Sequence, residues 1–148
     1  MIDVASYLTG YADGEGCFCV SLCKSNRHRF GWDIRPSFSV SQNQDRSQVL
    51  TLYQERWACG SIRPDRSDKT LKYEVRSVKE LVSVVLPHFK KYPLLSDKQR
   101  DFKIFARIVV MVFNKKHLDK SGFQKIVKLR EGINSSGKKR YHRTSIKI

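Results

Sequence analysis

Two segments in which apolar and polar residues alternate, residues 17–23 and 32–42, limit most strongly the folds available to this chain. Successive side chains of a β-strand point to opposite faces, so each segment is expected to form a strand with one buried face. The polar, basic segment 25–31 between them indicates a turn that joins the strands into a long antiparallel hairpin. The residues expected to face the core are Phe18, Val20 and Leu22 in the first strand and Ile34, Phe38 and Val40 in the second.

A second pair of alternating segments, residues 60–66 and 70–77, predicts another hairpin with Leu71, Tyr73 and Val75 directed inward. Helical spacing of apolar residues and helix-capping residues predict the remaining elements. The expected helices are 3–13, capped by Asp3 and stopped by Gly14 and Gly16; 45–57; 78–86, ended by Pro87; one from Ser96 to Asn114; and one from Ser121 to about Gly132.

The order of these elements is αββαββα, followed by two more helices. This order predicts an α+β fold in which helices cover one face of a four-stranded antiparallel sheet and leave the other face open as a saddle. Residues 1–135 are expected to form the domain. Residues 136–148 are expected to be a basic C-terminal tail, flexible when free, that either adds DNA affinity or only keeps the chain soluble.

The charge of the chain favours a polyanionic partner. Lys and Arg number 29 against 14 Asp and Glu, which gives a net charge of +15. Nucleic acid is the commonest partner that offsets such an excess; a basic protein without one, or a binder of membrane surfaces, is the alternative. No apolar run reaches the roughly 18 residues that span a bilayer, and the start of the chain lacks the basic residues of a signal or transit peptide. We therefore expect no membrane association and an intracellular location, in the cytoplasm or an organelle matrix.

The open face of the predicted sheet mixes hydrogen-bond donors, acceptors and cations, the residue types that contact base edges and phosphates. A sheet face exposed only to solvent would look similar, with more Glu and Lys and fewer Ser. The candidate DNA-binding residues are Cys19, Ser21, Cys23, Asp33, Arg35, Ser37, Ser39 and Ser41 of the long hairpin; Ser25, Arg27, His28 and Arg29 of its turn; Ser61, Arg63, Lys72, Glu74 and Arg76 of the second hairpin; and Lys138, Lys139 and Arg140 of the tail.

Cysteine and histidine spacing does not predict a metal site. Cys17, Cys19 and Cys23 share one face of a strand and lack the second pair that a zinc site needs, so we expect reduced thiols. The histidines also form no spaced pair typical of a metal site or of an HNH nuclease; they are His28, His88, His117 and His142.

Residues 8–16 read Leu-Thr-Gly-Tyr-Ala-Asp-Gly-Glu-Gly, at a predicted helix end that leads directly into the first strand. This segment resembles the motif of the LAGLIDADG homing endonucleases, and the order αββαββα matches that family too. So do Tyr92-Pro93-Leu94 and residues 117–127. The resemblance covers roughly residues 4 to 134 and implies a DNA endonuclease.

By this resemblance, Glu15 occupies the position of the family's metal-binding acid, and the Gly14 carbonyl is the second metal ligand. Phosphodiester hydrolysis needs a water activated by a divalent metal, hard cations take oxygen ligands, and the C-terminal end of a helix favours positive charge. We expect Mg²⁺ or Mn²⁺, with Ca²⁺ binding without supporting cleavage, and no small-molecule cofactor. The alternative is that Glu15 only ends the helix-to-strand turn.

The resemblance implies three further catalytic residues. Gln42 and Arg46 match the family's Gln and Arg that hold water and the scissile phosphate. Lys98 matches its Lys at the start of the long helix. Each of the three has the alternative of an ordinary surface residue. The fallback candidates for the Lys98 position are Ser96, Lys90 and Lys91.

Two glycines four residues apart, Gly10 and Gly14, predict a close helix–helix contact. Glycine within a helix costs up to about 1 kcal/mol relative to alanine, so a compensating interaction is expected. The chain carries one copy of the motif, and we therefore expect a homodimer in which two such helices meet across a two-fold axis. The predicted interface residues are Leu8, Gly10, Tyr11, Asp13 and Gly14.

These expectations combine into a site-specific endonuclease that makes a staggered double-strand break in a long, near-palindromic DNA target. By resemblance, cleavage crosses the minor groove, leaves 3′ overhangs, and the gene lies in an intron or intein. The alternatives are a catalytically silent DNA-binding protein, an RNA maturase that assists intron splicing, and a structural RNA-binding protein. The intact acid at Glu15 favours the enzyme.

Overall fold

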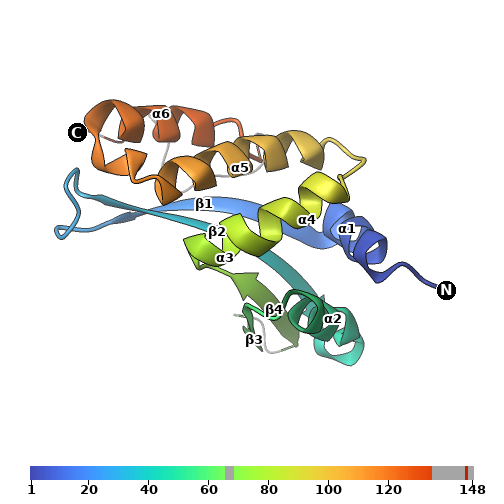
Figure 1. Cartoon of the computed structure of the whole chain (residues 1–148). Coiled ribbons are helices and arrows are strands. Elements are labelled where there is room, and N and C mark those ends of the chain that lie inside the picture. Colours follow the sequence, from blue (N-terminus) through green and yellow to red (C-terminus); the bar gives the residue numbers. More distant parts are fainter. Residues whose placement is uncertain (66–68, 135–145, 147–148) are drawn as a thin grey trace.

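The two predicted hairpins join into one antiparallel sheet, and helices pack against one of its faces (Figure 1). The computed structural model describes residues 1–65, 69–134 and 146. Its elements are α1 (Val4–Glu15), β1 (Gly16–Lys24), β2 (Trp32–Asn43), η1 (Gln44–Arg46), α2 (Gln48–Trp57), β3 (Ser61–Pro64), β4 (Thr70–Val75), α3 (Val78–Glu80), the π-helical turn η2 (Leu81–Val85), α4 (Leu86–Lys91), α5 (Lys98–Phe113), η3 (Lys116–Leu118) and α6 (Lys120–Arg130). None of the described helices combines the length and low polarity needed to cross a lipid bilayer.

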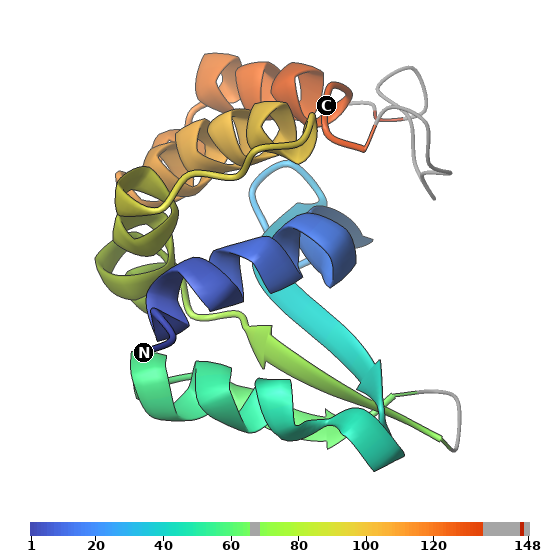
Figure 2. The same ribbon diagram turned by 90° about the vertical axis from the view of Figure 1, so that its right-hand side faces the viewer.

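The strands lie in the order β1-β2-β4-β3, with all neighbours antiparallel. Burial alternates along β1 and β2 as predicted, so Phe18, Leu22, Ile34 and Val40 face the helices. Figure 2, turned by 90°, shows α1, α2 and the later helices on one side of the sheet. The predicted α+β fold with one helix-covered face is thus confirmed.

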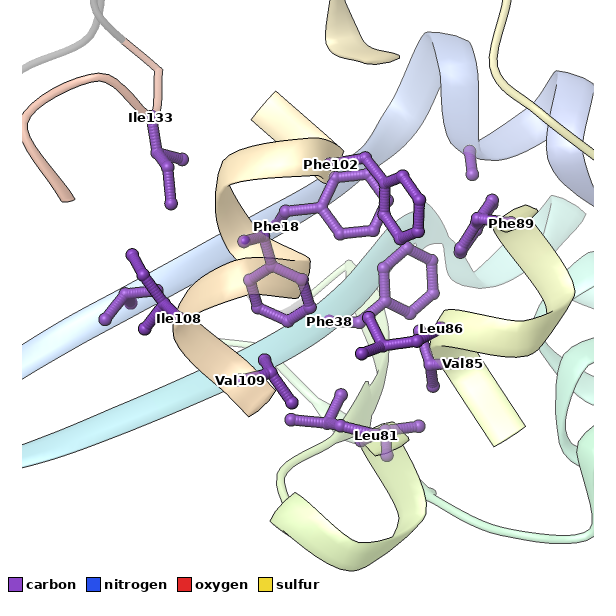
Figure 3. Close-up of a cluster of buried hydrophobic side chains, with 14 of the residues drawn as sticks. Phe18, Phe38, Leu81, Val85, Leu86, Phe89, Phe102, Ile108, Val109 and Ile133 are labelled. Carbon is purple, nitrogen blue, oxygen red and sulfur yellow. The ribbon is translucent and has the colours of Figure 1, made fainter. Parts of the chain in front are cut away.

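An aromatic cluster ties the helices to the sheet. The ring of Phe18 lies 5.2–5.4 Å from the rings of Phe38, Phe89, Phe102 and Phe105, which come from β2, α4 and α5 (Figure 3). All five rings are almost completely buried. Aromatic side chains bury large areas and pack well at offset angles, so this cluster sets where α4 and α5 sit on β1 and β2.

The helix after the second hairpin differs from its prediction. Pro87 was expected to end it, but α3, η2 and α4 run without a break from Val78 to Lys91. A proline inside an α-helix loses one hydrogen bond and clashes with the preceding turn. Here the preceding turn is π-helical, with the Leu86 amide bonded to the Leu81 carbonyl, and Pro87 stands in the first turn of α4. The wider turn accommodates the proline, so the prediction was wrong.

Other helix ends shift by a few residues. Asp3 caps α1 as predicted, but the helix passes Gly14 and ends at Glu15. The helix predicted from residue 45 begins at Gln48, after a short 3₁₀ turn. The Ser96 hydroxyl accepts from the Lys98 amide at the start of α5, while Asp119 caps α6. The predicted domain boundary at residue 135 remains a prediction, because residues 135–145 lie outside the described part of the chain.

A buried histidine joins three helices through hydrogen bonds. Trp57 donates its indole N–H to His88 Nδ1 at 3.3 Å, and His88 Nε2 lies 3.0 Å from the Thr9 hydroxyl. Because an indole only donates, Nδ1 is unprotonated and Nε2–H donates to Thr9, which in turn donates to the Tyr92 carbonyl at 2.9 Å. Burial, with the charge of Arg56 adding to it, lowers the pKa of His88 to about 4.

We expect stability to fall on mild acidification because of His88. The pKa of His88 in the folded protein lies below its usual value of 6.5, so folding favours the neutral imidazole. The stability that depends on this neutral form is fully present above pH 6.5. That contribution, about 3 kcal/mol, is lost as the pH falls from 6.5 towards 4. Urea unfolding measured across this range tests the expectation. A His88→Gln variant should lose this part of the pH dependence, and an unchanged slope would contradict the assignment.

Candidate nucleic-acid interface and catalytic site

The polar members of the strands share the open face of the sheet. Register places Cys19 opposite Ser37, Ser21 opposite Arg35 and Cys23 opposite Asp33. The same face continues across β4 and β3, where rows of directly opposed residues run Ser39–Glu74–Ser61 and Ser41–Lys72–Arg63. Arg76 follows one residue after the end of β4. The structure thus brings the strand residues predicted to contact DNA onto one surface, although Ser39 is almost buried within it.

Carboxylates lie among the cations of this surface. Asp33 Oδ2 is 2.5 Å from Arg35 Nε, and Asp33 Oδ1 is 3.2 Å from His28 Nε2. Glu74 Oε1 is 2.6 Å from Arg63 Nη2 and 3.6 Å from Arg76 Nε. Each carboxylate therefore contacts two basic side chains, and part of the positive charge of the open face is compensated.

The turn between β1 and β2 is tied to the helical layer. Arg29 donates through Nη1 to the Leu118 carbonyl at 2.6 Å, and the ring of Phe30 packs on that of Phe123 of α6. Ser25, Arg27 and His28 lie in the same turn; Arg27 and His28 are exposed. Lys138, Lys139 and Arg140 fall outside the described residues.

The thiols of Cys17, Cys19 and Cys23 in β1 belong to this face as predicted. These three cysteines, and Cys59 outside β1, are free and partly buried. Burial raises the pKa of the Cys17 thiol, which keeps it protonated and weakly reactive.

Glu15 and Gly14 form the exposed C-terminal end of α1, where the chain turns into β1. The last carbonyls of a helix carry partial negative charge, which favours a cation. Within the described residues, no three His, Cys, Asp or Glu side chains converge as a metal site. One chain thus offers a carboxylate and a nearby carbonyl, a small set of hard oxygen donors.

Lys98 lies against this helix end. Its ammonium donates to the Gly16 carbonyl at 2.6 Å and to the Ala12 carbonyl at 3.1 Å. The structure therefore brings Lys98 and Glu15 together at one end of α1, although the two residues lie 83 positions apart in the sequence.

Asp13 holds the loop that leads to Lys98. Its carboxylate accepts from the amides of Leu95, at 3.1 Å, and Ser96, at 3.0 Å, and from the Ser96 hydroxyl. Burial acts to raise the pKa of Asp13, but these hydrogen bonds outweigh it and the pKa lies below its usual value. Asp13 thus contacts backbone, and its predicted part in a dimer interface stays a prediction.

Gln42 and Arg46 are placed differently from each other. Gln42 donates through Nε2 to the Tyr11 hydroxyl, one helical turn before Glu15. Its Oε1 accepts from the Asn43 amide at 2.8 Å, so both ends of its amide group are engaged. Arg46 is exposed in η1, and no hydrogen bond or ion pair among residues 1–65 and 69–134 joins it to Glu15.

One face of α1 is left open beside two glycines. A Cβ atom added at Gly10 or Gly14 would meet no atom within 4 Å. Tyr7 of the same helix is exposed, and so is Leu95 of the loop before α5, at 94%. A groove of about 400 Å³ runs beside this face, and its lining includes Ser6, Gly10, Asp13, Tyr92 and Leu95. Packing within this chain therefore does not explain the two glycines.

Comparison with known proteins decides the family. The model of the LAGLIDADG endonuclease family matches residues 8–109, more than half of the chain. This chain belongs to the LAGLIDADG endonuclease family. The match starts at Leu8, the first residue of the motif that carried the resemblance.

Two curated relatives of this LAGLIDADG protein come from fungi. An uncharacterised 50.9 kDa protein in ND4 intron 1 of Podospora anserina is 39% identical over 115 residues, which cover 77% of this chain and 25% of the relative. The "Probable intron-encoded endonuclease 2" of Neurospora crassa is 31% identical over 130 residues, 87% of this chain and 29% of the relative. The chain thus spans about a quarter of the length of these relatives.

Solved structures match over most of the chain. The homing endonuclease I-TnaI superposes with a TM-score of 0.84 at 31% identity and covers 90% of this chain and 89% of its own. Meganuclease I-SmaMI, in a complex with uncleaveable DNA, gives a TM-score of 0.86 at 28% identity, covering 94% of this chain but 47% of its own.

Sequence reasoning missed three features of the site. Tyr11 was assigned only to a dimer interface, whereas its hydroxyl binds Gln42; the spacing of four residues between Tyr11 and Glu15 was the available signal. The acids of the open face were expected as DNA contacts, not as partners of arginines. The sequence also named no hydrogen-bond partners for His88, which the structure joins to Thr9 and Trp57 in the interior.

We expect Asp13→Asn to lower the stability of the protein. The amide cannot accept all three hydrogen bonds from residues 95 and 96, and a lost bond to a charged group costs roughly 1.5–3 kcal/mol. The loop before α5 would then loosen and shift Lys98. The midpoint of urea unfolding should fall, whereas Ser96→Ala, which removes one of the three bonds, should lower it less. Equal effects of the two variants would contradict this account.

Proposed function

We propose that this LAGLIDADG protein is a site-specific homing endonuclease that makes a metal-dependent, staggered double-strand break in a long, near-palindromic DNA target. The observation that carries the proposal is the helix end at Glu15, where an exposed acid, a lysine and an open glycine face meet beside a polar sheet surface. Relatives named as intron-encoded endonucleases support it, as does I-SmaMI in complex with DNA. Because these relatives are named as intron-encoded, we further propose that this protein is encoded in an intron and acts inside the cell.

The donor set at the end of α1 suits a hard divalent cation. We propose that the Glu15 carboxylate and the Gly14 carbonyl hold Mg²⁺ or Mn²⁺, since Mg²⁺ is commonly bound through one or two carboxylates and keeps several waters. When bound, such a metal lowers the pKa of a water and stabilises charge on the phosphate. Ca²⁺ should occupy the site without supporting cleavage; I-SmaMI bound to its uncleaved target in the presence of calcium ions supports this use.

The protein's own side chains would bind and orient the phosphate. Lys98 places a positive charge at the end of α1, where it can stabilise the leaving oxygen. Gln42 would orient water from a position that Tyr11 and Asn43 determine. Arg46, exposed just beyond β2, would contact the backbone next to the scissile bond.

Cutting both strands needs two such helix ends. We propose that Gly10 and Gly14 pack against the same face of a second copy, which brings two Glu15 side chains together. The length of the curated relatives leaves a second possibility, in which the second copy belongs to the same, longer polypeptide.

Glu15→Gln should abolish cleavage and preserve DNA binding. The amide keeps the size of the side chain but loses the charge that holds the metal, so cleavage should drop by roughly 10²-fold or more. Cleavage of a duplex library with Mg²⁺, together with binding in Ca²⁺, measures both properties. If Glu15→Gln cuts like the wild type, the catalytic assignment is wrong. A wild type that binds DNA without cutting would indicate the silent DNA-binding alternative.

Gly10→Leu should separate the two copies. A bulky side chain on the open face of α1 prevents close helix approach, so the mass from sedimentation equilibrium should change from dimer to monomer. Thr51→Leu, on an exposed position of α2, is the matched control and should stay dimeric. A monomeric wild type would contradict the homodimer.

A further inference from the structure

Glu74 is an acid on the sheet surface that is predicted to contact DNA. It lies on β4, directly opposite Ser39 of β2 and Ser61 of β3, so neighbouring strands flank it on both sides. Its side chain is only 14% exposed, on the open face of the sheet. A carboxylate there repels every phosphate that approaches, although the net charge of the whole chain is +15.

The contacts of Glu74 offset that repulsion. Its Oε1 accepts from Arg63 Nη2 at 2.6 Å across the β3–β4 pair and lies 3.6 Å from Arg76 Nε on its own segment. The side chains of both arginines remain about half exposed, at 48% and 54%. One end of each guanidinium is thus turned towards the carboxylate, while much of each side chain stays accessible from the open face.

We propose that Glu74 is a specificity-determining residue, which holds Arg63 and Arg76 in fixed poses for reading base edges and cancels their attraction to phosphates of unrelated sequences. The proposal rests on the DNA-binding function proposed above. A guanidinium that is already oriented loses less conformational freedom when it binds a guanine edge. Phosphate attraction is independent of sequence, so reducing it raises the ratio of specific to nonspecific affinity.

The other end of the sheet repeats the arrangement. Asp33 on β2 accepts from Arg35 Nε at 2.5 Å and lies 3.2 Å from His28 Nε2, again with one carboxylate between two basic groups on the open face. A carboxylate between two basic side chains thus occurs twice on the open face, on different strands. This recurrence indicates that the pairing belongs to the binding surface and is more than one ion pair that stabilises the sheet.

Glu74→Gln tests the proposal because it keeps the shape of the side chain and releases the two arginines. Wild-type protein in Ca²⁺ is first used to select a preferred duplex from a randomised library. Affinities for that duplex and for a scrambled duplex of equal length are then measured over a range of salt concentrations. We expect the variant to bind the scrambled duplex several-fold more tightly, with a salt slope steeper by about one. The ratio between the two duplexes should fall about tenfold.

Glu55→Gln is the matched control. It changes the net charge equally, but Glu55 is exposed on α2, which packs on the covered face of the sheet. The affinities of this variant for the selected and the scrambled duplex should change by the same factor, so that their ratio stays as in the wild type. Arg63→Lys is a second test variant that keeps the charge and loses the planar fork, and it should lower the ratio without changing the net charge.

The outcomes separate the two proposals. If the wild type selects no sequence, both the proposed function and this inference are overturned. If the wild type selects a sequence and Glu74→Gln keeps the same ratio, only the role of Glu74 is overturned. Equal weakening for both duplexes, with a lower urea midpoint, assigns Glu74 to sheet stability instead and also overturns it.

Discussion

The attachment of the last turn of α1 to the start of α5 is the interaction on which the candidate site depends. Lys98, the first residue of α5, donates from its ammonium to the carbonyl of Ala12, in the last turn of α1, and to the carbonyl of Gly16, the first residue of β1. Asp13, in the same turn, holds the loop that precedes α5. Glu15 and Lys98 therefore cannot move independently, and a lysine that neutralises a helix end also places its charge beside an exposed acid.

The same helix has two different faces. Ala5, Leu8 and Ala12 are buried against the rest of the molecule, and the Tyr53 hydroxyl donates to the Leu8 carbonyl. Gly10 and Gly14 lie on the surface with no atom near the place of a side chain. Packing within the chain thus sets the orientation of α1, and the glycines leave one side available for close approach by another helix.

Charge is distributed unevenly over the molecule. On the open face of the sheet, Asp33 and Glu74 compensate several arginines. Exposed cations also line the helices, among them Arg100, Lys103 and Arg107 on α5 and Lys125 and Lys128 on α6. Such a field draws a polyanion towards the protein as a whole, while the ion pairs of the sheet face reduce its share of that attraction.

Local patterns in the sequence were sufficient for the strands, the order of elements, the covered face and the position of the motif. Alternation with a period of two assigns each side chain to a face before any partner is known. The prediction at Pro87 failed because proline is a local signal for a helix end, whereas the π-helical turn before it depends on how Leu81 and Val85 pack in the core. The end of α1 was placed too early for a related reason: glycine permits a helix to stop, but here the Gly16 amide bonds to the Ala12 carbonyl and closes a last helical turn that includes Gly14.

What the sequence determined by itself was therefore the fold class, the acid at the end of a glycine-containing helix, and the excess of positive charge. Only the tertiary structure decided which groups meet: Lys98 with the end of α1, Gln42 with Tyr11, Glu74 with two arginines, and His88 with Thr9 and Trp57. Hydrophobic periodicity is written into neighbouring residues. Contacts between side chains that lie tens of residues apart depend instead on strand register and on the angles at which helices cross the sheet.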